Sequence, residues 1–468
     1  MRVLAPSQPR FWYTLCAVLG VIGLSAIAPY FLPQGLQVLL IALPPILLVV
    51  ALAVRHLEVC LVALVITAVT VPIDIGTGTQ TNIPFPLLAV PAMLALWALD
   101  MLRQRKLVVQ RSPGTWPSLS LMGLSLVLWI ASVAFWDVQV PVAPNRTWVQ
   151  IGQMAIFLLS PALFLLAANC IREERWLRYI TYATIGVGLL AVTNAILLYD
   201  LRMLPAYYFV GTTGFFGPWI VALAYGQLLF NHRLHAVLRL GCVLAMAGWM
   251  YWAWFHATNW LSGWVPFAVA LAVITWLRSR RAALALLLVL VLLSADAKTF
   301  IVATFVDPEI RGGSSRRPQI WQGALEIGSQ SPFIGLGPAN YMYYYRAYDP
   351  QEAIVSHNNY VDVFNQFGII GLALVLWFLW DVGRAGRQLW PRCPPGGFSR
   401  AYTASCLGGL VGITIGMMLG DWFLPYVYNI GLGGFRHSLY AWLFLGGLVS
   451  LHALQSQMHS AAPHGAEH

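Results

Sequence analysis

The sequence predicts an all-α, polytopic transmembrane helical bundle of 12–14 helices, and three observations carry this prediction. Of the 468 residues, 59% are hydrophobic and only 9% are charged, whereas a soluble protein has roughly 25% charged residues. The hydrophobic residues form blocks of about 18–24 residues with almost no charge inside them, which is the length that crosses about 30 Å of hydrocarbon. Because the bilayer interior has no water to bond peptide groups, these blocks must be helices.

Fourteen apolar segments follow one another along the chain. They cover residues 11–31, 35–54, 57–73, 84–102, 118–136, 147–170, 176–200, 215–231, 236–255, 259–277, 282–303, 358–381, 401–420 and 435–455. The third and eighth are short, so twelve full spans remain an alternative. The predicted organisation is transmembrane helices one to eleven in 1–303, a large periplasmic loop with short amphipathic helices in 304–356, helices twelve to fourteen in 357–455, and a cytoplasmic tail in 456–468.

The positive charges predict how the chain is threaded. The net charge is +10, but the basic residues are spread between apolar blocks, which excludes a nucleic-acid partner. Most of the 27 lysines and arginines fall in alternate loops, and loops rich in these residues stay in the cytoplasm. Both termini are therefore predicted to be cytoplasmic. The six cysteines stand singly, mostly inside apolar blocks, without the spacing of a metal site.

Several basic residues break this rule and fall on the outer side. They are Arg146, Arg202, Lys298, Arg311, Arg316, Arg317, Arg346 and Arg436. One interpretation is that they pair with acidic residues of the long loop or bind lipid headgroups. The other is that they form an outward-facing anion pocket. A diphosphate is the anion expected at a membrane surface, and guanidinium groups suit phosphate oxygens.

The long outer loop contains a predicted amphipathic helix and a turn. Residues 318–329 place Ile320, Trp321 and Leu325 on one helical face. Pro332 and the Gly335-x-Gly337 pair then end this helix and predict a turn. The glycine pair does not follow a strand, so it does not indicate a dinucleotide site.

His357 is the candidate for proton transfer. Ser356 is a suitable N-cap residue, which predicts that His357 lies in the first turn of a helix at the outer boundary of the membrane. An imidazole with an ordinary pKa near 6.5 accepts a proton at neutral pH. The alternative is a capping or interfacial histidine without chemistry, and His256 and His437 are competing candidates on the same side.

A tyrosine-rich stretch precedes His357. It contains Tyr341, Tyr343, Tyr344, Tyr345 and Tyr348. Such clusters often form the aromatic belt at a membrane surface. The alternative is a surface on which sugar rings stack, with Tyr345 as a candidate substrate contact.

These motifs together resemble the signature region of the O-antigen ligase and Wzy-type O-antigen polymerase family. The matching elements are Arg317 four residues before Trp321, then Pro332-x-x-Gly335-x-Gly337, then Ser356-His357-Asn358 opening a helix with Gly368-x-x-Gly371. They occur in this order over about 60 residues, after eleven apolar segments.

The resemblance implies an inverting, metal-independent glycosyltransferase of the bacterial inner membrane with its active site facing the periplasm. The donor would be an undecaprenyl-diphosphate-linked glycan, and the acceptor a glycan or lipid A–core. Arg317 and His357 would be the catalytic residues. The predicted substrate-binding residues are Arg146, Arg202, Arg311, Arg316, Tyr345, Arg346, Asn358 and Arg436. No cofactor is implied, and the other partner is membrane lipid.

Two arginines that are frequent in the family have no counterpart here. Leu261-Ser262-Gly263-Trp264 lacks the arginine that often follows the serine, and the nearest arginine before Gly214-Phe215-Phe216-Gly217-Pro218 is Arg202. Arg146, Arg202 or Arg436 are the candidate replacements. These departures favour a polymerase or a divergent relative over a standard ligase.

Two other function classes remain as alternatives. A flippase or transporter of lipid-linked oligosaccharide would require polar residues at mid-membrane depth, and the apolar segments contain almost none. A non-catalytic scaffold would not require outward-facing arginines. No acidic pair of the metal-binding kind accompanies His357 in an outer loop, so no essential metal is predicted.

Overall fold

The structure, a computed structural model, describes residues 56–72, 74–76, 82–106, 109–199, 209, 212, 214–256, 261–293, 317–351, 353 and 355–461. The chain divides into two compact units, residues 1–60 with 93–107 and residues 61–92 with 108–468. All contacts reported below lie within the second unit, which contains every described candidate residue.

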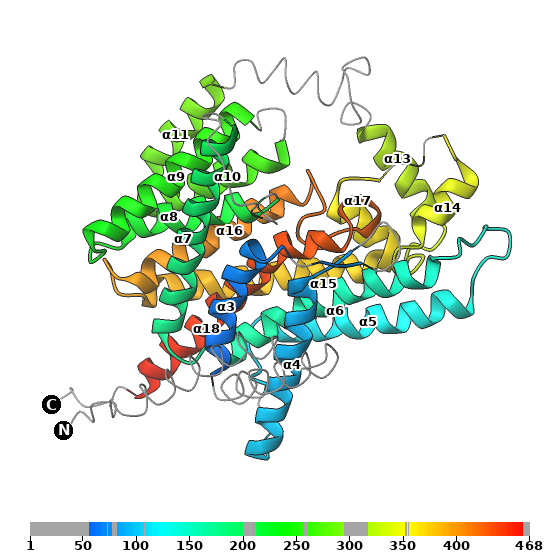
Figure 1. The fold of residues 1–468 in the computed structure, drawn as a ribbon, viewed down its shortest axis with the longest axis horizontal. Helices are drawn as coiled ribbons and strands as arrows, with labels where there is room; N and C mark the ends of the chain where they lie inside the picture. The colour runs from blue at the N-terminus through cyan, green and yellow to red at the C-terminus, as the bar shows by residue number, and fades with distance from the viewer. Residues whose placement is uncertain are drawn as a thin grey trace, which may run out of the picture. The chain divides into compact units, whose positions relative to one another are not determined.

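Helices dominate the described residues (Figure 1). They are α3 (Leu57–Thr70), α4 (Phe85–Gln104), α5 (Thr115–Ala134), α6 (Arg146–Cys170), α7 (Glu174–Tyr199), α8 (Phe216–Phe230), α9 (Ala236–His256), α10 (Leu261–Arg278), α11 (Arg280–Leu293), α13 (Arg317–Gly328), α14 (Tyr341–Tyr348), α15 (Asn359–Leu389), α16 (Phe398–Gly416), α17 (Val427–Ile430) and α18 (Phe435–Ala461). Short 3-10 turns cover Trp390–Arg392 and Leu432–Gly434. Two short antiparallel strands, β1 (Asp74–Gly76) and β2 (Asn82–Pro84), form a hairpin.

The predicted fold class is confirmed. Among the described residues, seven helices are long and apolar enough to cross a membrane, namely α4, α5, α6, α7, α9, α15 and α18. Three shorter apolar helices accompany them, and two of these are α3 and α8, which the sequence had indicated as short. Every predicted segment from 57–73 onward overlaps a helix in its described part, whereas residues 259–260 and 294–303 of two of them lie outside the described residues. The first two segments, 11–31 and 35–54, lie outside the described residues.

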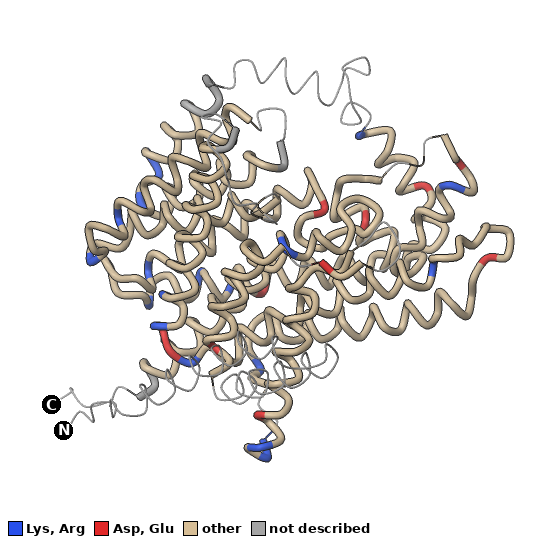
Figure 2. Tube along the Cα trace, in the orientation of Figure 1, with Lys and Arg blue, Asp and Glu red and all other residues tan. Residues whose placement is uncertain are grey.

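Close helix packing follows from small residues. The strongest helix pairs join α16 to α8 and α10, and α6 to α18. At Gly412 of α16, a side chain would come within 2.5 Å of the carbonyl oxygen of Pro266, and at Gly408 within 2.8 Å of that of Ala270. Glycine therefore lets α10 and α16 approach at backbone distance, as is common between membrane helices. Figure 2 shows charged residues mainly near the ends of the helices.

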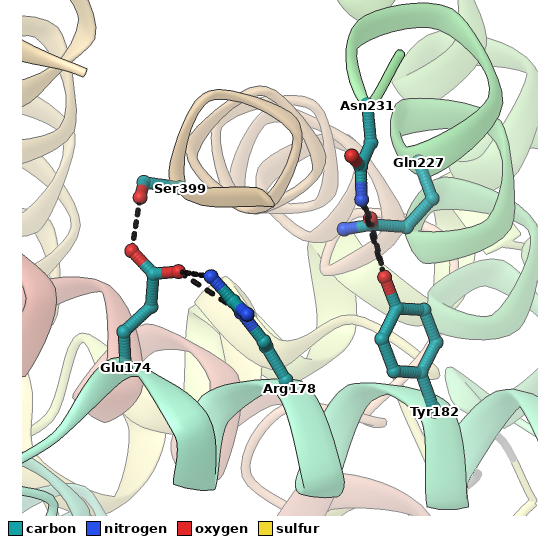
Figure 3. Close-up of polar contacts among 6 residues, drawn as sticks. All are labelled: Glu174, Arg178, Tyr182, Gln227, Asn231 and Ser399. Carbon is teal, nitrogen blue, oxygen red and sulfur yellow. Dashed lines mark hydrogen bonds and ion pairs between the residues drawn. The ribbon is translucent and has the colours of Figure 1, made fainter. Parts of the chain in front are cut away.

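Loops that were predicted to be cytoplasmic bond to one another. The backbone N–H of His232, after α8, donates to the carbonyl of Gly396, before α16, at 3.1 Å. The Ser399 hydroxyl donates to Glu174 at the start of α7, and Glu174 also pairs with Arg178 (Figure 3). The connections after α6, α8 and α15 therefore share one end of the bundle, as the alternation of charge predicted.

A second network in Figure 3 joins α7 to the end of α8. The Tyr182 hydroxyl donates to Gln227 Oε1 at 3.0 Å, and Asn231 Nδ2 donates to the same oxygen at 2.8 Å. These hydrogen bonds hold α7 against the end of α8.

At the opposite end, α15 is broken, and a loop fills the break. Gly368 has non-helical backbone angles (φ 62°, ψ −163°) inside α15. The N–H of Leu336 donates to the carbonyl of Asn365 at 2.9 Å, and the N–H of Ile369 donates to the carbonyl of Pro332 at 2.8 Å. The backbone groups released by the break are thereby bonded, as an apolar environment requires.

The amphipathic helix and the turn of the long loop are both present. The predicted helix at 318–329 corresponds to α13, one residue earlier at each end. Gly335 and Gly337 adopt positive φ angles of 68° and 86°, which glycine adopts without steric cost. This turn carries the chain across the broken part of α15.

Candidate functional site

The turn before α15 differs from the sequence-based prediction. The N-cap of α15 is Asn358, whose side-chain oxygen accepts hydrogen bonds from the N–H groups two and three residues later, at 3.0 and 3.4 Å. The helix begins at Asn359. The prediction that Ser356 caps the helix and that His357 lies in its first turn is therefore wrong. His357 lies in the turn, outside the helix, with a left-handed φ of 50°.

Ser356 has a different role, because it anchors this turn. Its hydroxyl accepts from the N–H of Asn358 at 3.0 Å and donates to Asp362 Oδ1 at 2.6 Å. The same carboxylate oxygen accepts from the Tyr341 hydroxyl at 2.7 Å. Competition from this local bonding explains why serine does not cap the helix. The result is a left-handed His357 held between two bonded neighbours.

The segment 417–429, after α16, lies against the turn. The N–H of Asn359 donates to the carbonyl of Met417 at 2.8 Å, and its side-chain nitrogen donates to the carbonyl of Leu424 at 2.7 Å. Its side-chain oxygen accepts from the N–H groups of Phe423 and Leu424 at 3.0 and 3.1 Å. One buried asparagine thus fixes the segment that carries Asp421 and Asn429.

Asp421 and Asn429 form a chain of polar groups with His357. Asn429 Nδ2 lies 3.0 Å from His357 Nδ1 and also donates to Asp421 Oδ1. The other oxygen of Asp421 accepts from the N–H of Tyr426 at 2.9 Å. Asp421 is only 1% exposed, so a buried carboxylate stands behind the asparagine that contacts the histidine.

Arg317 brings a cation to the same place. It is the first residue of α13 and is 8% exposed. Its Nη1 donates to the carbonyl of Leu419 at 3.0 Å, whereas its Nε has no hydrogen-bond partner within the described part of the chain. Trp321, one turn later, donates to the carbonyl of Ser356 at 2.8 Å and fixes α13 against the turn. A buried guanidinium with an unused donor is suited to an anionic ligand.

These neighbours change the protonation of the site. Burial and the nearby Arg317 guanidinium lower the pKa of His357 to about 4. Burial raises the pKa of Asp421 to about 6, although its hydrogen bonds and Arg317 oppose this shift. Burial also lowers the pKa of Arg317, which stays charged because its ordinary value is so high. At pH 7, His357 is therefore neutral and Asp421 mostly ionised.

The tyrosines of α14 lie mainly in a buried cluster. Tyr345 is 1% exposed, and Tyr341 is fully buried and stacks on Tyr426 with ring centroids 5.0 Å apart. Tyr348 is exposed and donates to Asp137 at 3.2 Å. The cluster is connected to the turn that holds His357, because Tyr341 donates to the same Asp362 oxygen that accepts from Ser356. Its position indicates packing more than a membrane belt.

Arg146 and Arg346 lie in the same region of the fold. Arg146 is buried, donates to the carbonyl of Ser132 at 2.8 Å, and stacks on Trp136 with 3.5 Å between the guanidinium carbon and the ring centroid. Arg346 is exposed at the end of α14 and lies 5.3 Å from the ring of Tyr428. Since Tyr428 directly precedes Asn429, Arg346 marks the rim of the site.

Arg436 lies elsewhere, at the start of α18. Its guanidinium pairs with Asp74 at 2.6 Å and donates to the carbonyls of Ala68 and Val71 at 2.9 and 3.0 Å. These bonds satisfy carbonyl groups at the end of α3 and do not connect Arg436 to the turn that holds His357. The remaining candidate arginines, Arg202, Arg311 and Arg316, lie outside the described residues.

The competing histidines have aromatic neighbours. His256 stacks on Trp252 at the end of α9, with ring centroids 4.2 Å apart. His437 meets Trp422 edge-on at 5.4 Å, so it lies beside the segment that carries Asp421. Gly214 packs on the same Trp422, which places the start of the Gly214–Pro218 element near the site.

Sequence reasoning missed Asp421 and Asn429 as members of the site. Neither residue belongs to a motif that the sequence analysis identified. The one available signal was a lone acidic residue, Asp421, within an almost uncharged stretch between two spans. Acidic residues in such positions are costly unless they have a use.

One part of the chain matches a known family. Residues 236–376 match a family model described as O-antigen ligase, which confirms the resemblance that the ordered motifs indicated. The matched region begins with α9 and ends within α15, so it includes Arg317 and His357 and stops before Asp421 and Asn429. No curated protein matches the chain.

Proposed function

Since this chain carries an O-antigen ligase region within a multi-pass helical membrane protein, we propose that it is a glycosyltransferase of the bacterial inner membrane. It moves glycan from undecaprenyl diphosphate to an acceptor on the periplasmic face. The observation that carries the proposal is the buried guanidinium of Arg317, whose Nε has no hydrogen-bond partner among the described residues. This guanidinium lies close to the neutral imidazole of His357 and to the carboxylate of Asp421.

The donor diphosphate supplies the negative charge that Arg317 is placed to meet. Cations stabilise charge that develops on a departing group, and they act most strongly where water is excluded. Arg346 at the rim is the second candidate contact for phosphate among the described residues. His357 contacts the reacting oxygens from the other side. Because protein cations meet the diphosphate, we propose that the reaction needs no divalent metal. We also propose that it is inverting, as the family resemblance implies.

The first test replaces each central residue in the full-length protein. We expect His357→Ala and Arg317→Ala to be produced and folded normally and to lose transfer of lipid-linked glycan by on the order of 100-fold or more. His232→Ala and Arg233→Ala are matched controls, because both residues are exposed at the opposite end of the bundle. Full activity in both site variants would remove the proposal.

The acceptor separates a ligase from a polymerase. Purified protein in bilayers is given the lipid-linked donor with either lipid A–core or further lipid-linked repeat units. Transfer to lipid A–core identifies a ligase, whereas extension of the repeat units identifies a polymerase. The same assay in excess chelator tests metal independence, and activity that collapses there and returns with a divalent cation would contradict it.

A further inference from the structure

The hydrogen bonds of Asn429 determine which nitrogen of His357 carries the proton. A side-chain amide nitrogen has two hydrogens to donate and does not act as an acceptor. Asn429 Nδ2 lies 3.0 Å from His357 Nδ1 and also bonds to Asp421 Oδ1. Both of its hydrogens are thus used, and Nδ1 must be the acceptor. In the neutral ring the proton then lies on Nε2.

The orientation of the Asn429 amide follows from Asp421. A reversed amide would place its oxygen against a carboxylate oxygen, so that two acceptors would face each other. Asp421 itself is held by the N–H of Tyr426 at 2.9 Å. The buried carboxylate therefore selects the nitrogen end of Asn429, and that nitrogen selects the tautomer of His357.

The neighbouring guanidinium of Arg317 favours the neutral form of the His357 ring. Arg317, from α13, is the cation whose charge reaches His357, and it disfavours a second positive charge on the ring. Asp421 does not contact the ring directly, because Asn429 stands between them. The resting imidazole is thus neutral, and its second nitrogen, Nε2, is a donor.

We propose that Asn429, fixed by Asp421, is a positioning residue that holds His357 as the neutral Nε2–H tautomer, so that His357 donates a hydrogen bond to substrate and does not take its proton. This inference rests on the proposed function. The acceptor hydroxyl oxygen bonds to the anomeric carbon while the bond from that carbon to the diphosphate oxygen breaks. The new bond forms on the face opposite the diphosphate, so the hydroxyl proton passes to water, while His357 and Arg317 stabilise the negative charge of the departing diphosphate.

Nitrogen NMR of the full-length protein in bilayers tests the tautomer without any activity measurement. The chain is labelled with ¹⁵N-histidine, and the signals of His357 are those absent from His357→Gln. At pH 7.5 we expect an unprotonated Nδ1 and a protonated Nε2. In Asn429→Asp the new carboxyl group accepts from the ring, so Nδ1 should gain the proton. Asn169→Asp, a buried asparagine at the opposite end, should leave the signals unchanged.

Transfer by the same variants tests the donor role. Asn429→Asp should lower kcat by on the order of 100-fold, the loss typical of removing one donor to a developing negative charge. A protonated Nδ1 in the unaltered protein would overturn the inference, and so would full kcat in Asn429→Asp with the tautomer reversed. If the unaltered protein transfers no glycan, the proposed function fails, whereas the spectra still decide the tautomer.

Discussion

His357 has a left-handed backbone conformation at the position that we propose contacts the substrate. Hydrogen bonds of its neighbours stabilise this conformation. A non-glycine residue with a φ of 50° is disfavoured by roughly 1–3 kcal/mol, and such residues persist where surrounding bonds determine the geometry. Ser356 and Asn358 supply those bonds on either side. The strain therefore turns the imidazole away from α15 and toward Asn429.

Ser356→Ala tests this anchor. The change removes one acceptor and one donor from a buried site, so we expect a loss of roughly 1–3 kcal/mol of stability and reduced transfer. Thermal unfolding in detergent and steady-state kinetics measure the two effects. Ser329→Ala is the control, because its exposed hydroxyl donates only to Glu326 within the described contacts. Unchanged melting and kinetics in Ser356→Ala would show that the turn does not depend on this serine.

The pH dependence of transfer should follow Asp421 and not His357. Below a pH of about 6, Asp421 gains a proton and releases its hold on Asn429, whereas His357 stays neutral to about pH 4. Arg317 opposes this rise in the pKa of Asp421, and Asp362 is a second carboxyl group close enough to interact with Asp421. We expect kcat to fall below an apparent pKa of about 6. In Asp421→Asn, activity should be low at every pH and this limb absent; a limb that persists would exclude Asp421 as its source.

Asp421 and His357 contribute to the pH dependence of stability with opposite signs. Folding raises the pKa of Asp421 from 3.8 to about 6, so the free energy of unfolding falls as pH rises through this window. Folding lowers the pKa of His357 from 6.5 to about 4, so this contribution rises with pH over nearly the same window. These two contributions oppose each other, so kcat is the more direct measurement of the protonation of Asp421.

Local motifs predicted half of the site, and long-range contacts supplied the rest. Arg317 and His357 stand in short ordered patterns that carry the family resemblance. Asn429 comes 72 positions after His357, in a short helix that no periodic pattern announces. Its role depends on Asn359, which bonds to the chain near Leu424. Single-residue chemistry cannot reveal such a pairing.

At the scale of elements, the break in α15 is the feature that shapes the site. The sequence predicted the turn at Pro332 and a helix with His357 in its first turn, but it gave no sign that the loop would interrupt this helix. Gly368 permits the break, because a side chain there would overlap the backbone of Phe333. Gly335 permits the loop to pass, because a side chain there would overlap the backbone of Gln366 and Phe367. The loop that crosses α15 at this break follows α13, so it connects α13 to the region of the turn that carries His357.

A broken helix is also a feature of transporters, where unbonded backbone groups at the break bind the cargo. Here the loop uses these groups. Besides the bonds at Leu336 and Ile369, the N–H of Gly337 donates to the carbonyl of Gln366 at 3.0 Å, and Gln366 in turn accepts from the N–H of Ala339 at 2.9 Å. The break therefore supports a structural role, which favours the transferase over a flippase.

Gly368→Ala should disrupt this element. Its φ of 62° and ψ of −163° fall in a region that is essentially restricted to glycine, and an added methyl group would overlap the backbone of Phe333. We expect loss of more than about 3 kcal/mol of stability, seen as a lower melting temperature or as aggregation on gel filtration. Gly383→Ala, in the same helix but in looser surroundings, should fold at least as well as the unaltered protein. Equal melting of the two variants would contradict this account.

At the scale of the whole chain, the alternation of positively charged loops predicted which loops share an end of the bundle, which the helix propensity of single residues could not do. Loops assigned to one side bond to one another, as His232 does with Gly396, and loops assigned to the other side do the same, as Asn359 does with Leu424. The sequence could also count the helices from α3 onward, because an apolar block of fixed length is a strong signal. It could not predict how α16 packs on α10, since that contact depends on which glycines face each other.

Which end faces the periplasm remains a prediction, and accessibility to a membrane-impermeant thiol reagent tests it. Arg346 and Arg233 are both exposed and are assigned to opposite ends. The described native cysteines are buried, apart from half-buried Cys60. In cells with a permeabilised outer membrane, Arg346→Cys should be labelled quickly, whereas Arg233→Cys should react only after the inner membrane is opened. The reverse pattern would place the Arg317–His357 site at the cytoplasmic face and would contradict the proposed reaction on the periplasmic face.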